Sequence, residues 1–200
     1  MQLYSNPASP FVRKVRVSAH ELRLTGRIEL LDITQSPVNP HRELRAHNPL
    51  GKIPALITDA GESLYDSAVI CEYLEALAGG NRLFPAPGPA RWTALRRQAL
   101  ADGMADAAVL VRYEQTARPA TLQWQDWIEA QFLKIRTALD ALESENLDAR
   151  CDIGAISIAC ALDYLDLRFP GERWRETRPR LGAWHAALSE RPSLAATRPV

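Results

Sequence analysis

The chain has 200 residues, of which 46% are hydrophobic and 24% are charged, as is typical of globular proteins, so a disordered or fibrous chain is excluded. Its 24 basic and 24 acidic residues give a formal net charge of zero. Nucleic-acid binding and attachment to an anionic membrane both need a basic surface, so neither is expected as the main function.

The sequence gives no sign of export or of a metal site. Its longest apolar stretch, residues 153–162, is too short to cross a bilayer, and the first residues lack the pattern of a signal peptide. The three cysteines, Cys71, Cys151 and Cys160, form no C-x-x-C pair. Neither a disulfide framework nor a zinc site is therefore expected, and a reducing cytoplasm fits this cysteine usage.

The first part of the chain alternates between predicted strands and helices. Helices are expected after the cap Ser9 and from the cap Ser67 to about Ala78. Residues 34–51 are rich in Pro and Asn and predict an irregular segment with a short helix near 41–46. Strands are expected at residues 2–4, 28–31, 53–57 and 62–64.

The second part of the chain predicts only helices. Residues 78–90 are rich in Gly and Pro and predict a linker. All five tryptophans follow residue 90, which indicates two domains built on different plans, 1–77 and 91–200. The apolar segment 153–167 predicts a buried central helix. The other helices are expected at residues 92–113, at 122–142 behind the cap Thr121, and at 180–190.

Three short motifs in the first domain have residues suited to binding a small anionic peptide. Ser9 opens a helix, whose N-terminus can stabilise a thiolate. If the bond between Ile53 and Pro54 is cis, the backbone of Ile53 can pair with an extended peptide. Asp66 and Ser67 could hold the ammonium and carboxylate of an amino acid. Taken singly, each motif is better explained by an ordinary helix cap or turn.

The order of these motifs resembles the glutathione S-transferase family. Residues 9–14 read Ser-Pro-Phe-Val-Arg-Lys and look closest to bacterial transferase-like members. The linker and the helical second part match as well, so the resemblance covers essentially the whole chain. It implies an α/β thioredoxin-like N-terminal domain, an all-α C-terminal helical bundle and a homodimer.

The resemblance implies that the chain uses glutathione as co-substrate and that Ser9 donates a hydrogen bond to its sulfur. Other classes of the family use Tyr or Cys in this role. Tyr4, at the end of the first predicted strand, is therefore a rival hydroxyl, and Ser5 is a weaker one. No cysteine lies near the first helix, so thiol–disulfide chemistry by a protein thiol is not expected.

The resemblance also implies which residues bind the rest of the tripeptide. The cysteinyl part is expected on the backbone of Ile53, beside a cis Pro54, and the γ-glutamyl end on Asp66 and Ser67. Two further charged residues are expected at the ends of the tripeptide: Lys52 at the glycine carboxylate and, from the partner subunit, Asp102 at the γ-glutamyl amine.

A small hydrophobic electrophile is expected between the two domains, against Phe11, Met104 and Tyr113. For Met104 and Tyr113, packing in the core is an open alternative. Arg112 and Arg118 either line this cleft or form ion pairs between helices, and pairing is favoured.

Two functions are consistent with the resemblance. One is an enzyme that transfers glutathione to the electrophile, as in detoxification. The other is a non-catalytic glutathione-binding or regulatory protein of the same fold, because fold alone does not determine function. The sequence does not identify the electrophile.

Overall fold

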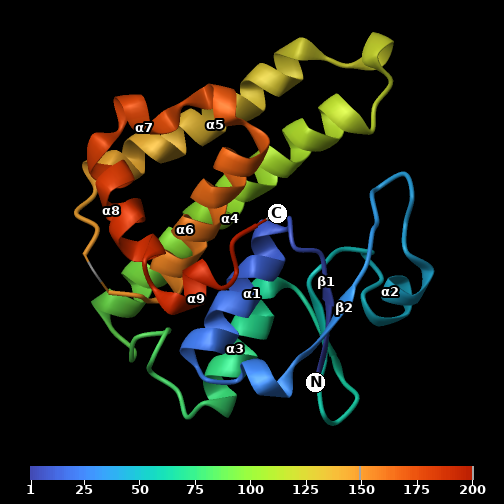
Figure 1. Cartoon of the computed structure of the whole chain (residues 1–200), viewed down its shortest axis with the longest axis vertical. Coiled ribbons are helices and arrows are strands. Elements are labelled where there is room, and N and C mark those ends of the chain that lie inside the picture. The colour runs from blue at the N-terminus through green and yellow to red at the C-terminus, as the bar shows by residue number, and fades with distance from the viewer. Residues whose placement is uncertain (149, 200) are drawn as a thin grey trace.

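A small sheet with three helices forms the first part of the chain, and a helical bundle forms the second (Figure 1). The structure is a computed structural model that describes residues 1–148 and 150–199. The strands are β1 (Gln2–Ser5), β2 (Glu29–Asp32), β3 (Ala55–Ile57) and β4 (Ser63–Leu64), and the first helices are α1 (Pro10–Glu21), α2 (Arg42–His47) and α3 (Ser67–Leu77).

The strand order in the sheet is β2-β1-β3-β4. β1 and β2 are parallel, and α1 makes the crossover between them, whereas β3 runs antiparallel to both β1 and β4. Successive side chains of a strand point to opposite faces. Leu3 and Leu56 accordingly pack with α1 and α3, whereas Tyr4 and Ala55 pack with Leu44 of α2 on the other face.

The second part of the chain is helical throughout. α4 (Pro89–Thr116) and α5 (Gln125–Ser144) form a long helical pair, and α6 (Ile153–Arg168) packs along α4 (Figure 1). α6 is buried over most of its length, including Ile156, Ala159 and Leu162, as its apolar sequence predicts. The shorter helices are α7 (Trp174–Thr177), α8 (Pro179–Ser189) and α9 (Pro192–Ala195).

The structure confirms the predicted fold class and corrects several helix starts. Asp66, not Ser67, caps α3, and its carboxylate accepts the N–H of Ala68 at 2.9 Å. Asp and Ser are equally good caps, so the order of the two residues leaves the choice open. α5 begins after Trp124 and not after Thr121, which lies in the short 3-10 helix Ala120–Leu122.

The segment between α3 and α4 is shorter than predicted and is well anchored. Pro89 opens α4, because a proline at the first helical position loses no intrahelical hydrogen bond. The buried Glu75 carboxylate accepts the backbone N–H groups of Arg82 and Leu83. Leu83 packs in one core cluster with α1, α3 and α6. The division into domains at residues 78–90 stays a prediction, and this core joins the two parts of the chain.

None of the helices in the described ranges combines the length and the apolar character that crossing a bilayer requires.

Gly154 of α6 lies against α4, and we expect Gly154→Ala to lower the free energy of unfolding by about 1–3 kcal/mol. A Cβ at this position would lie 2.7 Å from both the backbone oxygen of Ala94 and Cβ of Arg97. Gly103 in α4 is the matched control, because a Cβ there meets nothing within 4 Å. Gly103→Ala should raise stability by up to about 1 kcal/mol. Equal stabilities of the two variants in urea unfolding would contradict this helix contact.

Candidate functional site

A cavity of about 410 Å³ lies between the N-terminus of α1 and the facing surfaces of α4 and α6. Its walls bring together residues far apart in the sequence: Asn6, Ala8, Ser9, Pro10, Phe11, Thr34, Gln35, Lys52, Ile53, Asp106, Val109, Arg112, Tyr113, Thr116, Tyr164 and Arg168. Of the predicted site residues, Ser9, Phe11, Lys52, Ile53 and Tyr113 therefore line one cavity.

Ser9 is the N-cap residue of α1, as its sequence context predicts. Its Oγ accepts the backbone N–H of Val12 at 3.3 Å, so the hydroxyl proton is free to be donated to a ligand. Pro10 has no N–H group, and the N–H of Phe11 has no acceptor among the described residues. The wall of the cavity thus contains a hydroxyl donor and the N-terminus of α1, which carries a partial positive charge.

The rival hydroxyls lie elsewhere. Tyr4 is only 5% exposed, and its ring packs against His47, with 5.7 Å between the ring centres, on the α2 face of the sheet. Burial, with a smaller effect of Glu43, raises the pKa of Tyr4. The Oγ of Ser5 is buried. Neither residue lines the cavity, so Ser9 is the hydroxyl of the three that a ligand there would meet.

The loop before β3 brings a backbone edge to the cavity. The bond between Ile53 and Pro54 is cis, as the family resemblance implies. The buried Asn48 holds this loop, since its side-chain amide donates to the carbonyl of Lys52 at 2.8 Å. Lys52 and Ile53 both line the cavity, whereas Pro54 is buried behind them.

Asp66 and Ser67 lie at the N-terminus of α3. Asp66 is exposed, whereas Ser67 is buried, with 2% of its surface accessible. Burial raises the pKa of Asp106, and the charge of Asp66 raises it further, whereas Lys52 and Lys14 lower it. Neither Asp66 nor Ser67 is among the residues that line the cavity, although the charge of Asp66 acts on Asp106 in its wall.

Asp102 forms an ion pair with Lys14 of the same chain. Both carboxylate oxygens lie 2.7 Å from Nζ of Lys14, which is 1% exposed. Burial raises the pKa of Asp102, and the Lys14 ammonium opposes this effect. The pair joins α1 to α4 beside the cavity. The predicted approach of Asp102 to the γ-glutamyl amine in a partner subunit stays a prediction.

The helical wall of the cavity contains Tyr113 but not Met104. Met104 is 2% exposed and packs in the core with Ala101, Ala108 and Val111. These residues share one face of α4 at spacings of three and four. The cavity is lined from the neighbouring face, which carries Asp106, Val109, Arg112, Tyr113 and Thr116. The alternative of core packing therefore describes Met104, while Tyr113 lines the cavity.

Arg168 was not among the site residues predicted from the sequence, and among the described residues Arg112 does not form the ion pair that the sequence favoured. Arg118 does pair with Glu114, which lies four residues earlier in the last turns of α4, and not with a residue of another helix, at 2.8 Å. Arg112 lines the cavity and forms no ion pair within residues 1–148 and 150–199. Arg168, in the last turn of α6, also lines it. The available signal was the one arginine of α6, which lies in the last turn of this helix.

A larger cavity of about 660 Å³ lies further along α4 and α5. It shares Tyr113 with the first cavity, but Ser9 does not line it. Its walls are mostly apolar, with the exposed side chains of Val38, Leu122 and Trp124. Because Ser9 lines the smaller cavity, the smaller cavity is the candidate site.

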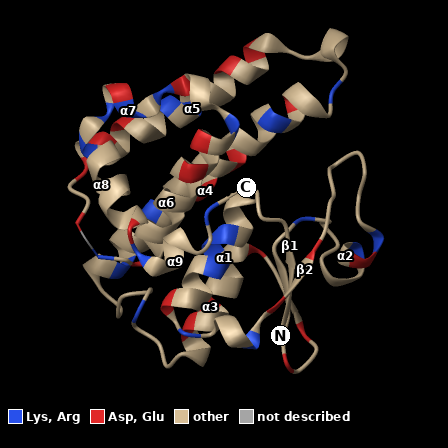
Figure 2. Cartoon of the chain, in the orientation of Figure 1, with Lys and Arg blue, Asp and Glu red and all other residues tan. Residues whose placement is uncertain are grey.

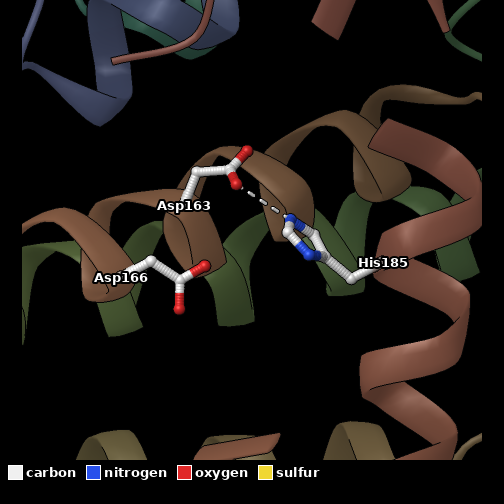
Figure 3. A group of neighbouring side chains, drawn as sticks. All are labelled: Asp163, Asp166 and His185. Atoms are coloured by element: carbon white, nitrogen blue, oxygen red, sulfur yellow. Dashed lines mark ion pairs between the residues drawn. The ribbon is translucent and has the colours of Figure 1, made fainter. Parts of the chain in front are cut away.

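Asp163, Asp166 and His185 form the one group among the described residues with the spacing of a metal site (Figure 3). The donor atoms are already engaged. Nε2 of His185 lies 3.1 Å from Asp163, and Arg175 bonds both Asp166 and Nδ1 of His185, at 2.5 and 3.0 Å. Arg13 binds the other oxygen of Asp163. Two guanidinium groups repel a cation, so the group fits an ion-pair network and not a metal.

The protein's own thiols are poorly suited to nucleophilic chemistry. Burial raises the pKa of Cys71 to about 11 and that of Cys160 to about 12. Burial also raises the pKa of Cys151 to about 12. Since the thiolate is the nucleophile, a reactive sulfur in this site must come from a bound molecule.

Comparisons with known proteins agree with the geometry. Residues 8–77 match the model of the glutathione S-transferase N-terminal domain, and residues 125–187 match that of the C-terminal domain. The chain is 35% identical to the uncharacterized GST-like protein YibF of Escherichia coli K12, over all of this chain and 98% of that protein.

Solved structures are closer still. A glutathione transferase family member from Pseudomonas fluorescens Pf-5, with bound glutathione, is 50% identical over 100% of this chain and 98% of its own, with a TM-score of 0.97. A structure of a family member from the same strain, with bound S-(propanoic acid)-glutathione, is 49% identical over the full length of both chains, with a TM-score of 0.92. The fold, the Ser9 site and these matches together show that the chain belongs to the glutathione S-transferase family.

Proposed function

We propose that the protein is a glutathione transferase that ionises the thiol of bound glutathione for attack on a small hydrophobic electrophile. The observation that carries this proposal is the position of Ser9, whose hydroxyl stands at the N-terminus of α1 on the wall of the 410 Å³ cavity. Relatives with the same fold were crystallised with bound glutathione.

In this mechanism, the chain supplies ionisation and proximity. The thiol proton passes to solvent, and the Ser9 hydroxyl and the helix N-terminus stabilise the remaining thiolate. Each unit by which the thiol pKa falls corresponds to about 1.4 kcal/mol in favour of the ionised form. The sulfur electron pair then forms the C–S bond while the leaving group departs with its bonding pair. Phe11 and Tyr113 hold the electrophile against the sulfur.

Glutathione is held by the first domain in this proposal. The backbone of Ile53 pairs with the cysteinyl part, and Lys52 attracts the glycine carboxylate. Asp66 and Ser67 hold the γ-glutamyl end at the start of α3. Acidic and basic residues are interspersed along the helices and loops of the described chain (Figure 2). Attraction for the anionic tripeptide therefore comes from these placed groups and not from the overall field.

Asp66→Asn should weaken glutathione binding about tenfold, because it removes the negative charge opposite the γ-glutamyl ammonium. Asn caps a helix as well as Asp, so the stability of α3 should hardly change. Calorimetric titration with glutathione measures the affinity, and thermal unfolding controls for the cap. An unchanged affinity would argue against this role of Asp66.

The homodimer, the cytoplasmic location and the role in detoxification belong to the same proposal. Support for the dimer comes from large exposed apolar side chains on α4, α5 and the segment between them: Trp92, Leu110, Leu122, Trp124 and Leu133. In the dimer, Asp102 would reach the partner's γ-glutamyl amine. Sedimentation at increasing protein concentration tests the dimer, and a monomer throughout would contradict it.

Turnover and binding together test the proposed function. We expect the protein to be retained on immobilised glutathione and to conjugate glutathione with an aryl halide. Retention without turnover across a panel of electrophiles would instead favour the non-catalytic binding protein. Failure to bind glutathione would contradict both.

A further inference from the structure

Arg112 and Arg168 bring positive charge to the cavity without an acidic partner. Arg112 projects from α4 and Arg168 from the last turn of α6, and both line the cavity that Ser9 lines. In the part of the chain that the structure describes, neither guanidinium forms an ion pair, whereas Arg118 pairs with Glu114 at 2.8 Å. The helical wall opposite α1 therefore carries two positive charges that form no ion pair with any carboxylate of residues 1–148 and 150–199.

Arg168 also has an unused hydrogen-bond donor. Its Nε is buried and has no acceptor among the described residues. A buried donor without a partner is unfavourable and rare, and an oxygen of a bound ligand would satisfy it. The guanidinium carbon lies 6.0 Å from the ring centre of Tyr164, one turn earlier on α6. The planar guanidinium group matches a carboxylate in shape and can donate two parallel hydrogen bonds to it.

The other charged groups of the cavity do not neutralise these arginines. Asp106 lines the same cavity, and burial raises its pKa, while Lys52 and Lys14 lower it. Among the described residues, Asp106 forms no ion pair with either arginine. The arginines instead act on Tyr164, whose pKa is raised by burial and lowered by both guanidinium charges.

We propose that Arg112 and Arg168 form a binding subsite for a carboxylate carried by the electrophilic substrate, and hence by the sulfur substituent of the glutathione conjugate. The inference rests on the proposed function, since Ser9 holds the sulfur on one wall and the arginines hold the acid on the other. Short halogenated alkanoic acids have the chemistry that this proposal requires, because each carries both a carboxylate and an electrophilic, halogen-bearing carbon. The thiolate forms the C–S bond at the halogen-bearing carbon, and the halide leaves with the electron pair of the C–halogen bond.

Two glutathione conjugates that differ only in the last group of the sulfur substituent, a carboxylate in one and a methyl group in the other, test this subsite by calorimetric titration. The probes are S-(2-carboxyethyl)glutathione and S-propylglutathione. The wild-type protein should bind the acid at least about tenfold more tightly than the propyl conjugate. In the double variant Arg112→Met/Arg168→Met this ratio should fall to about one, and lysine at both positions should restore part of it. Arg180→Met, at an exposed position of α8, is the matched control and should keep the wild-type ratio.

Three results would overturn the subsite. The wild type could bind both conjugates equally, or the double variant could keep the preference for the acid. Glutathione itself could lose as much affinity in the double variant as the acid conjugate does, which would assign the arginines to the tripeptide. If the wild type binds neither glutathione nor a conjugate, the proposed function itself fails, which is a distinguishable outcome.

Discussion

Ser9→Ala is expected to lower kcat/KM for conjugation about 10- to 100-fold and to raise the pKa of the bound thiol by about one to two units. The hydroxyl would donate a hydrogen bond to a charged sulfur, and such bonds contribute about 1.5–3 kcal/mol. Steady-state kinetics with an aryl halide measure the first effect. The pH dependence of kcat/KM measures the second, because its midpoint follows the ionisation of the thiol.

Ser9 is also the cap of α1, so the two roles need separate variants. Ser9→Gly removes the hydroxyl but lowers the stability of the helix by only about a few tenths of a kcal/mol, because Gly is itself a good N-cap residue. It should lose activity as Ser9→Ala does, whereas Ser9→Thr should keep most of it. Tyr4→Phe and Ser5→Ala should stay near the wild type, because neither side chain lines the cavity. Full activity of Ser9→Gly would contradict the assignment.

Asp163→Ala should lower the free energy of unfolding by about 3–5 kcal/mol, because it leaves a buried cation without its partner. Arg13 of α1 is 2% exposed and bonds Asp163 as well as the carbonyls of Leu194 and Thr197. His185 would lose its contact with the same carboxylate (Figure 3). The network thus joins α1 to α6 and to the C-terminal segment.

Glu176→Ala is the control for Asp163→Ala. Glu176 also pairs with an arginine, Arg173, at 3.0 Å, but both side chains are exposed, Glu176 by 60% and Arg173 by 71%. Exposed pairs contribute less than about 1 kcal/mol, so this variant should unfold almost as the wild type does. Equal losses in the two variants, measured by urea unfolding, would show that burial of the Arg13 pair has no special effect.

The same carboxylate should make stability fall in acid. Burial would raise the pKa of Asp163, but the hydrogen bond from His185 and the charge of Arg13 outweigh it and lower that pKa. A lowered folded-state pKa means that the stabilisation is complete above the ordinary value of about 4 and is lost as the pH falls below it. Asp163→Asn should show a smaller loss of stability in this range than the wild type. An identical pH profile would contradict the linkage.

Local rules in the sequence predicted the parts of the site that depend on one segment. Ser9 before Pro10 predicts a helix start, and the structure has it there. Between Asp66 and Ser67 the same rules cannot choose, since both residues cap helices, and the true cap is Asp66.

Features that depend on the packing of one helix against another could not be predicted from the sequence. Met104 and Tyr113 lie on different faces of α4, and only the packing of α6 against α4 decides which face lines the cavity. The ion pair of Asp102 with Lys14 and the cavity position of Arg168 likewise depend on contacts far apart in the sequence. No spacing along the chain encodes them.

The ultraviolet absorbance of the thiolate, followed against pH in the complex of the wild-type protein with glutathione, tests the central claim most directly. The account predicts a midpoint at least about one unit below that of free glutathione, since free thiols ionise near pH 8.5 and Ser9 with the N-terminus of α1 favours the anion. A midpoint equal to that of free glutathione would contradict it.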